Sequence, residues 1–171
     1  MNKIEKIGFG GGCHWCTEGI FQSLIGIIEV EQGWIASVGE FEKLSEGVIV
    51  HFDPSKIELK VLIEIHLLTH ASTSNHSMRQ KYRSAVYTFN KEQSEIVDTI
   101  IIDLQAGFEV PVITQVLPFN CFESNIDTQL NYFYSKPNAP FCKSYIHPKI
   151  SLILAQFGQY LNMDKVPENI I

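Results

Sequence analysis

Gly10–Cys16 reads GGGCHWC and joins two different sequence patterns. The apolar run Ile4–Phe9 before it predicts a strand, and Thr17–Leu24 after it predicts a helix. Glycines allow the backbone to turn sharply between the two and to approach a ligand closely. A helix N-terminus has free N–H groups and a partial positive charge, so a Cys13 thiol placed there should lose its proton easily. The stretch therefore predicts a strand, a turn and a helix that present a nucleophilic or redox-active cysteine.

The composition is that of one folded domain. The chain has 171 residues, of which 45% are hydrophobic and 19% are charged, and we expect a single domain over 1–171. The net charge is −6 and the basic residues are scattered, which argues against a nucleic-acid partner. No apolar run approaches the roughly 20 residues of a membrane helix, and residues 1–6 lack the pattern of a secretory signal. We therefore expect a cytoplasmic protein with no membrane association.

The cysteines are too few for a disulfide scaffold. They are Cys13, Cys16, Cys121 and Cys142. Cys13 and Cys16 are three apart at a predicted helix start, so they share a face and lie within disulfide reach. In a cytoplasmic protein such a pair is catalytic, redox-active or metal-binding. The alternatives are two small buried side chains, or half of a zinc site for which the chain has no second Cys-x-x-Cys.

Two histidines have a spacing that suits a metal. His66 and His70 are four apart on a predicted helix, but Leu67 fills the position where a metalloprotease carries its Glu. We interpret both as structural histidines, and we expect neither a metal nor a bound cofactor.

The predicted elements follow the order β-α-β-β-α-β, then a helix, a strand, an irregular segment over 120–140 and a final helix. The first six elements match the split β-α-β of a ferredoxin-like fold. We therefore expect an α+β two-layer sandwich, with a mostly antiparallel sheet and helices on one face. The predicted strands are 3–9, 27–35, 45–52, 84–89 and 110–117, and the predicted helices are 13–24, 56–70, 91–104 and 148–161.

Four other side chains could take part in the chemistry only if the fold brings them close to Cys13. Glu46 opens a predicted strand, and a carboxyl group buried beside a nucleophile can hold a proton and act as a general acid. Tyr82 ends a polar loop. Trp15 and Trp34 would form an apolar wall, although a tryptophan is more often ordinary core packing.

Gly11–Glu18, which reads GGCHWCTE, resembles the signature GGCFWCTE of the peptide methionine sulfoxide reductase A family. Further segments resemble that family in the same order: Glu46–Pro54, Tyr82–Tyr87, Pro137–Cys142 and Ile146–Lys149. The resemblance implies an oxidoreductase that reduces methionine S-sulfoxide, peptide-bound or free, and so repairs proteins after oxidative stress.

The resemblance also implies a role for each matching residue. Cys13 would attack the sulfoxide sulfur, Glu46 would give a proton to the sulfoxide oxygen, and Tyr82 would hydrogen-bond that oxygen. Trp15 would pack against the substrate methyl group. The sulfenic acid formed on Cys13 would react with a second thiol to give a disulfide. Thioredoxin or a similar dithiol would then reduce that disulfide.

The chain departs from the family pattern on the substrate side. His14 replaces a Phe and Trp34 replaces a Tyr. In the loop before Tyr82, which is shorter than is usual, Ser77 replaces an Asp and Arg79–Lys81 replaces Gly-Thr-Gln. We expect substrate contacts from His14, Trp15, Trp34 and Ser77. A more polar wall suits a more polar ligand, so the alternatives are another small sulfoxide or oxidised sulfur compound, or a non-catalytic redox or binding role on the same scaffold.

The second thiol is not where many relatives carry it, because the tail Gly158–Ile171 has no cysteine. Cys16 is the first candidate for resolving the sulfenic acid, through its proximity to Cys13, and Cys142 is the second. Cys121 has no counterpart in the family pattern, and we expect it to be buried.

Overall fold

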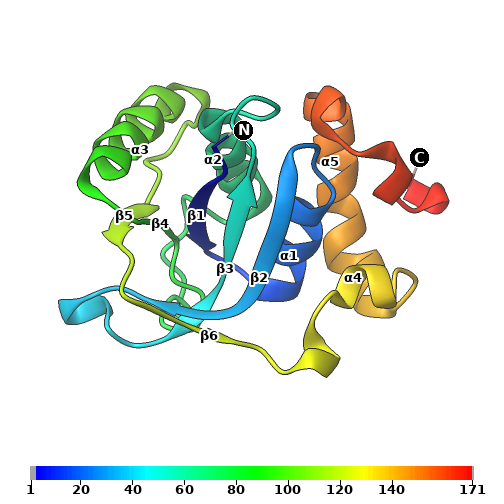
Figure 1. Ribbon diagram of the computed structural model, residues 1–171, viewed down its shortest axis with the longest axis horizontal. Coiled ribbons are helices and arrows are strands. Elements are labelled where there is room, and N and C mark those ends of the chain that lie inside the picture. Colours follow the sequence, from blue (N-terminus) through cyan, green and yellow to red (C-terminus); the bar gives the residue numbers. More distant parts are fainter. Residues whose placement is uncertain (1–2, 171) are drawn as a thin grey trace.

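A computed structural model describes residues 3–170. At its centre lies a mixed six-stranded sheet in the order β5-β4-β1-β3-β2-β6 (Figure 1). Neighbouring strands are antiparallel except β4 and β5, which are parallel. The strands are β1 (Glu5–Gly10), β2 (Ile27–Ala36), β3 (Ser45–Phe52), β4 (Ala85–Thr88), β5 (Gln115–Pro118) and β6 (Cys121–Ser124). The α-helices are α1 (His14–Gln22), α2 (Leu59–Thr69), α3 (Lys91–Leu104), α4 (Tyr132–Ser135) and α5 (His147–Phe157). These elements confirm the predicted α+β class.

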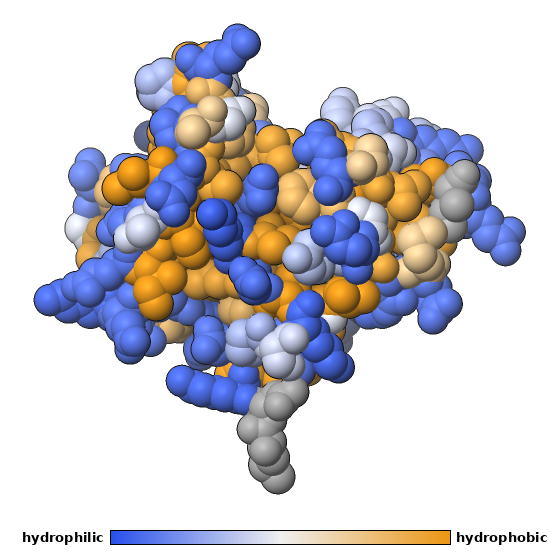
Figure 2. Space-filling view, turned by 90° about the horizontal axis from the view of Figure 1, so that it is seen from above, coloured by the Kyte–Doolittle hydropathy of each residue, from blue (hydrophilic) through white to orange (hydrophobic). Residues whose placement is uncertain are grey.

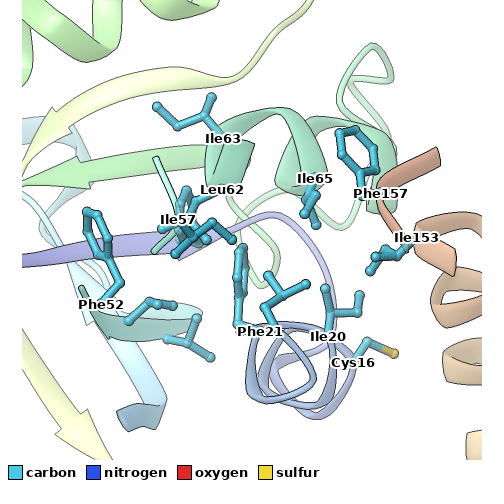
Figure 3. Packing of buried hydrophobic residues seen from close by; sticks show 14 of the residues in the cluster. Cys16, Ile20, Phe21, Phe52, Ile57, Leu62, Ile63, Ile65, Ile153 and Phe157 are labelled. Carbon is cyan, nitrogen blue, oxygen red and sulfur yellow. The ribbon is translucent and has the colours of Figure 1, made fainter. Parts of the chain in front are cut away.

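The main hydrophobic core lies between one face of the sheet and the helices. Successive side chains of a strand point to opposite faces, and in β3 the alternate residues Val48, Val50 and Phe52 enter this core. Ile49, which points the other way, belongs to a smaller cluster on the opposite face. Figure 3 shows side chains of α1, α2, β3 and α5 meeting in the main core, with Cys16 at its edge. The helices therefore gather on one face, as the sequence predicts.

Several element bounds differ from the expectation. α2 begins at Leu59 instead of 56, because the Asp53 carboxylate accepts hydrogen bonds from the Ser55 N–H (3.0 Å) and hydroxyl (2.6 Å) and holds a turn there. β5 begins only at Gln115, and α5 ends at Phe157. The segment expected to be irregular contains β6, which pairs with β2 at the edge of the sheet. The expectation that Cys121 is buried is wrong, because it lies exposed on this edge strand.

The surface mixes apolar and hydrophilic side chains. Seen from above, apolar patches are broken up by hydrophilic residues (Figure 2). Two apolar side chains are especially exposed. Ile102 (73% exposed) lies on α3, and Ile126 (65% exposed) lies just before a short 3-10 helix at 127–129. Among the described residues, no helix has the length and apolar character needed to cross a bilayer.

Candidate active site

The glycine turn between β1 and α1 presents Cys13. β1 ends at Gly10 and α1 begins at His14, so Cys13 is the residue immediately before the helix. Gly11 has a φ of 154°, and a Cβ at this position would lie 2.4 Å from the His70 ring. Only glycine tolerates both this backbone angle and this close approach. The turn therefore depends on Gly11 packed against an imidazole from the end of α2.

Cys13 starts the helix through its own backbone. Its carbonyl accepts hydrogen bonds from the N–H groups of Cys16 (3.1 Å) and Thr17 (3.2 Å) and from the Thr17 hydroxyl (3.2 Å). Cys13 itself is only partly buried. The first turn of α1 thus fixes the backbone of Cys13.

The surroundings of Cys13 favour the thiolate. A hydrogen bond from the Cys16 thiol is the largest influence and lowers the pKa of Cys13; burial opposes it, and the backbone N–H groups of Trp15 and Cys16 lower the pKa further. The charge of Glu46 raises the pKa of Cys13, but the net direction is downward. The same hydrogen bond, followed by burial, raises the pKa of Cys16. Cys16 therefore keeps its proton and shares it with the Cys13 sulfur.

The sheet carries Glu46 to the start of α1. β1 and β3 are antiparallel with Gly10 opposite Gly47, which places the preceding residue of β3 beside the glycine turn. Glu46 is buried, with 8% of its surface exposed. The backbone N–H of His14 donates to its Oε2 atom at 3.1 Å. A carboxyl group thus lies at the positive end of α1, next to the cysteine.

Lys81 and Tyr82 lie on the other side of Glu46. The Lys81 ammonium is 3.7 Å from Glu46 Oε1 and 5.1 Å from the centre of the Tyr82 ring. Tyr82 is partly buried, whereas Ser77 is exposed on the same loop. The Arg79 guanidinium fastens this loop, because it donates to the carbonyls of Gly11 and Tyr82, both at 2.9 Å.

An aromatic cluster surrounds Trp15. Its ring stacks on Tyr132 of α4, with centroids 4.1 Å apart and planes 4° apart, and it meets the edge of Phe141 at 5.5 Å. The buried Glu18 carboxylate positions α4, because it accepts the N–H groups of Asn131 (3.0 Å) and Tyr132 (3.2 Å) at the start of that helix. Glu18 therefore links the cysteine motif to the aromatic wall.

His14 is buried, with 5% of its surface exposed, and both ring nitrogens face protein groups. Nδ1 is 2.9 Å from the carbonyl oxygen of Gly33, which can only accept, so Nδ1 carries the proton. Nε2 then accepts from the Asn125 amide at 3.4 Å, and that amide also donates to Gln32 at 2.7 Å. Trp34 meets the His14 ring edge-on at 5.3 Å. The imidazole thus joins α1, β2 and the segment after β6.

The remaining cysteines differ in accessibility. Cys142 is fully buried in a π-helical turn, Cys142–Ile146, and burial raises the pKa of its thiol. Cys142 is near enough to Cys16 for their charges to interact. Cys121 is exposed on β6, at the edge of the sheet. Within residues 3–170, no group of three or more His, Cys, Asp or Glu side chains is arranged to hold a metal ion.

The structure assembles most of the predicted site residues and adds others. The predicted residues near the glycine turn are Cys13, His14, Trp15, Cys16, Trp34, Glu46 and Tyr82. Sequence reasoning missed Lys81, Tyr132, Phe141 and Asn125. Phe141 lies in the segment Pro137–Cys142 that resembles the family, the signal for Tyr132 was the aromatic content of 132–141, and Asn125 had none.

Comparisons with known proteins agree with this arrangement. The model of the family described as peptide methionine sulfoxide reductase matches residues 5–160. A protein named peptide methionine sulfoxide reductase MsrA from Trichodesmium erythraeum is 31% identical over 170 residues, which cover 90% of this chain and 96% of that protein. The chain therefore belongs to the peptide methionine sulfoxide reductase family.

Solved structures show the same fold. The reduced form of Mxr1 from Saccharomyces cerevisiae has a TM-score of 0.73 at 19% identity, over 84% of this chain and 91% of that chain. Mxr1 in complex with Trx2 has a TM-score of 0.60 at 18% identity, over 74% of this chain and 84% of that chain.

Proposed function

We propose that this protein reduces methionine S-sulfoxide, free or peptide-bound, to methionine, with Cys13 as the nucleophile. The observation that carries the proposal is the position of the Cys13 thiol at the start of α1, beside the Glu46 carboxyl group. The Cys16 thiol lowers the pKa of Cys13 there. A thiolate and a proton source on either side of a sulfoxide are what this reduction needs. Membership of the family supports the same reaction.

The reaction moves one oxygen atom between two sulfur atoms. The Cys13 thiolate attacks the sulfoxide sulfur, and Tyr82 hydrogen-bonds the sulfoxide oxygen. Glu46 must take up a proton before this step, and it then gives that proton to the same oxygen. The S–O bond of the substrate breaks and an S–O bond to Cys13 forms, so the substrate sulfur is reduced by two electrons and Cys13 becomes a sulfenic acid. Trp15, backed by Tyr132, forms the apolar wall for the substrate methyl group.

A second thiol completes the cycle. Cys16 is our first choice because it already hydrogen-bonds the Cys13 sulfur; attack on the sulfenic acid forms a disulfide and releases water. Cys142, buried nearby, is the second choice. The dithiol that reduces the disulfide is thioredoxin or a similar protein, and the complex of Mxr1, a protein of the same fold, with Trx2 supports this assignment.

We also propose that the whole chain is one domain whose core is a ferredoxin-like sandwich. The sheet order β4-β1-β3-β2, with α1 and α2 as the two connecting helices, supports this assignment. A cytoplasmic location suits cysteines that must stay reduced, and the four thiols are free in the structure.

The test is a thioredoxin-coupled assay across methionine sulfoxide, its peptides and other small sulfoxides. We expect turnover of methionine S-sulfoxide, none in Cys13→Ser, and a reduction step roughly 10²–10⁴ times slower in Glu46→Gln. Mass spectrometry of the oxidised protein identifies the resolving cysteine. Preference for another sulfoxide would assign a different substrate, and a wild-type rate no higher than that of Cys13→Ser would leave only a non-catalytic role.

A further inference from the structure

The backbone of Lys81 is tied to the strand that carries Glu46. The Lys81 carbonyl accepts hydrogen bonds from the Glu46 N–H (2.9 Å) and the Ser45 hydroxyl (2.8 Å), and the Lys81 N–H donates to the Met78 carbonyl (3.1 Å). These contacts join the polar loop to the first two residues of β3. Lys81 is therefore a fixed part of the site, although it belongs to a loop.

The side chain of Lys81 occupies the outer side of the Glu46 carboxyl group. Its ammonium is 3.7 Å from Oε1, while Oε2 faces the N–H of His14. The ammonium also lies over the Tyr82 ring. A hydrogen bond to Tyr82, and then the charge of Glu46, raise the pKa of Lys81, so the side chain stays charged. The side chain is 54% exposed, which leaves room for a ligand to reach the ammonium.

We propose that the Lys81 ammonium, together with Tyr82, binds the oxygen of the substrate sulfoxide and stabilises the negative charge that develops there as Cys13 attacks. This inference rests on the proposed function. A sulfoxide oxygen is already partly negative, and attack at sulfur pushes further charge onto it. A donor fixed in advance where charge develops lowers the barrier, and a charged donor makes a stronger hydrogen bond than a neutral one.

A second feature of the same loop supports this role. Arg79 donates to the carbonyl of Gly11, next to the cysteine turn, and to the carbonyls of Tyr82 and Ser74, each at 2.9 Å. It also donates to the Ala71 carbonyl. Where the family pattern has Gly-Thr-Gln, this chain has Arg79, which holds the loop in place, and Lys81, whose ammonium faces Glu46. The loop thus replaces a neutral amide with a positive charge at a position held rigid by hydrogen bonds.

The experiment measures the single-turnover rate of Cys13 oxidation by N-acetyl-methionine sulfoxide methylamide, which carries no charge. Lys81→Met should lower this rate about 10- to 100-fold, Lys81→Arg should stay within about threefold of wild type, and KM should change little. Salt should slow wild type but not Lys81→Met. Lys91→Met is the matched control, because the Lys91 ammonium is also 3.7 Å from a carboxylate, that of Glu95 on α3, and its rate should not change.

Each outcome decides the question. If wild type turns over and Lys81→Met is equally fast, or if Lys81→Arg is as slow as Lys81→Met, the proposal is wrong. If the loss appears only with free methionine sulfoxide and only in KM, Lys81 recruits the substrate carboxylate and does not act on the oxygen. If wild type does not turn over any methionine sulfoxide, the proposed function itself fails. Circular dichroism checks that each variant folds. If Lys81→Met does not fold, the test uses the single-turnover rates of Lys81→Gln and Lys81→Arg, together with the salt dependence of the wild-type rate.

Discussion

His70 should make the protein lose stability between pH 7 and pH 5. Its Nδ1 faces the carbonyl of His66, which can only accept, so Nδ1 carries the proton and Nε2 accepts from the Ser84 hydroxyl at 2.8 Å. Ser84 in turn accepts from the Thr114 hydroxyl, also at 2.8 Å. The hydrogen bond that Nε2 accepts from Ser84 requires a neutral imidazole. Burial lowers the pKa of His70 from 6.5 to about 4, which agrees with that requirement.

The direction and size of the effect follow from these two pKa values. The unfolded chain binds a proton at pKa 6.5 and the folded chain only at about 4, so acid favours unfolding. The stabilisation is complete above the unfolded value and is lost as the pH falls toward the folded value. The whole difference corresponds to about 3 kcal/mol, of which about 2 kcal/mol is lost between pH 7 and pH 5. His66, whose ring stacks on His70 and whose pKa burial also lowers, acts in the same direction.

Urea unfolding at pH 7, 6 and 5 measures the effect in wild type and in His70→Gln. The variant should be less stable at pH 7, because it loses the imidazole hydrogen bonds, but its free energy of unfolding should fall by about 2 kcal/mol less than that of wild type on going to pH 5. Titration of the His70 ring by NMR gives the folded pKa directly. Equal losses in the two proteins, within about 0.5 kcal/mol, would refute the assignment of a buried neutral imidazole.

Three further predictions concern stability. Gly11→Ala should lower the free energy of unfolding in urea by at least about 2 kcal/mol, since its Cβ would overlap the His70 imidazole. Gly12→Ala, where a Cβ meets open space, should change it by no more than about 1 kcal/mol. Similar losses in the two variants would contradict the strained turn. Asn90→Ala should cost about 1 kcal/mol, because Asn90 accepts the N–H of Gln93 (2.8 Å) at the start of α3, and an unchanged midpoint would remove this cap. His14→Phe restores the family residue but should cost about 1–3 kcal/mol through the hydrogen bonds it breaks, and equal stability would show that they contribute nothing.

The fold was predictable where local pattern and packing agree. β3 and α3 have the predicted bounds, because the signal for each is local. In β3 it is the alternation of apolar residues, and in α3 it is the Asn90 cap, which accepts the N–H of Gln93. β6 was missed, since four residues carry too little pattern to indicate a strand. Its pairing with β2 comes from residues more than 80 positions away in the chain, with Trp34 opposite Glu123. An edge strand pairs with only one neighbouring strand, so its other side is open. The exposed position of Cys121 follows from this place at the edge.

The candidate site also contains residues that a local pattern brings together and residues that depend on long-range pairing. Cys13, Trp15 and Cys16 are adjacent in sequence, so the strand, turn and helix pattern alone brought them together. Glu46 could be named from the sequence only on the condition that the fold brings it to Cys13, because its place beside the turn depends on the register of β1 with β3. The role of Glu18 could not be read from the chain at all, because its partners are the first N–H groups of a helix more than 110 residues later.

Lys81 shows why composition alone is a poor guide to the charge of a site. A chain with a net charge of −6 gives no reason to expect a cation beside the Glu46 carboxyl group, and a lysine in a polar loop is usually solvated. Two hydrogen bonds to the Lys81 carbonyl, from Ser45 and Glu46, change this, because they fix the loop against β3 with the ammonium 3.7 Å from Glu46 Oε1. In the proposed mechanism, one long-range pairing of the backbone therefore sets the charge beside the sulfoxide oxygen. Substitutions of Ser45 that loosen this pairing should weaken the effect of Lys81 without removing any charge.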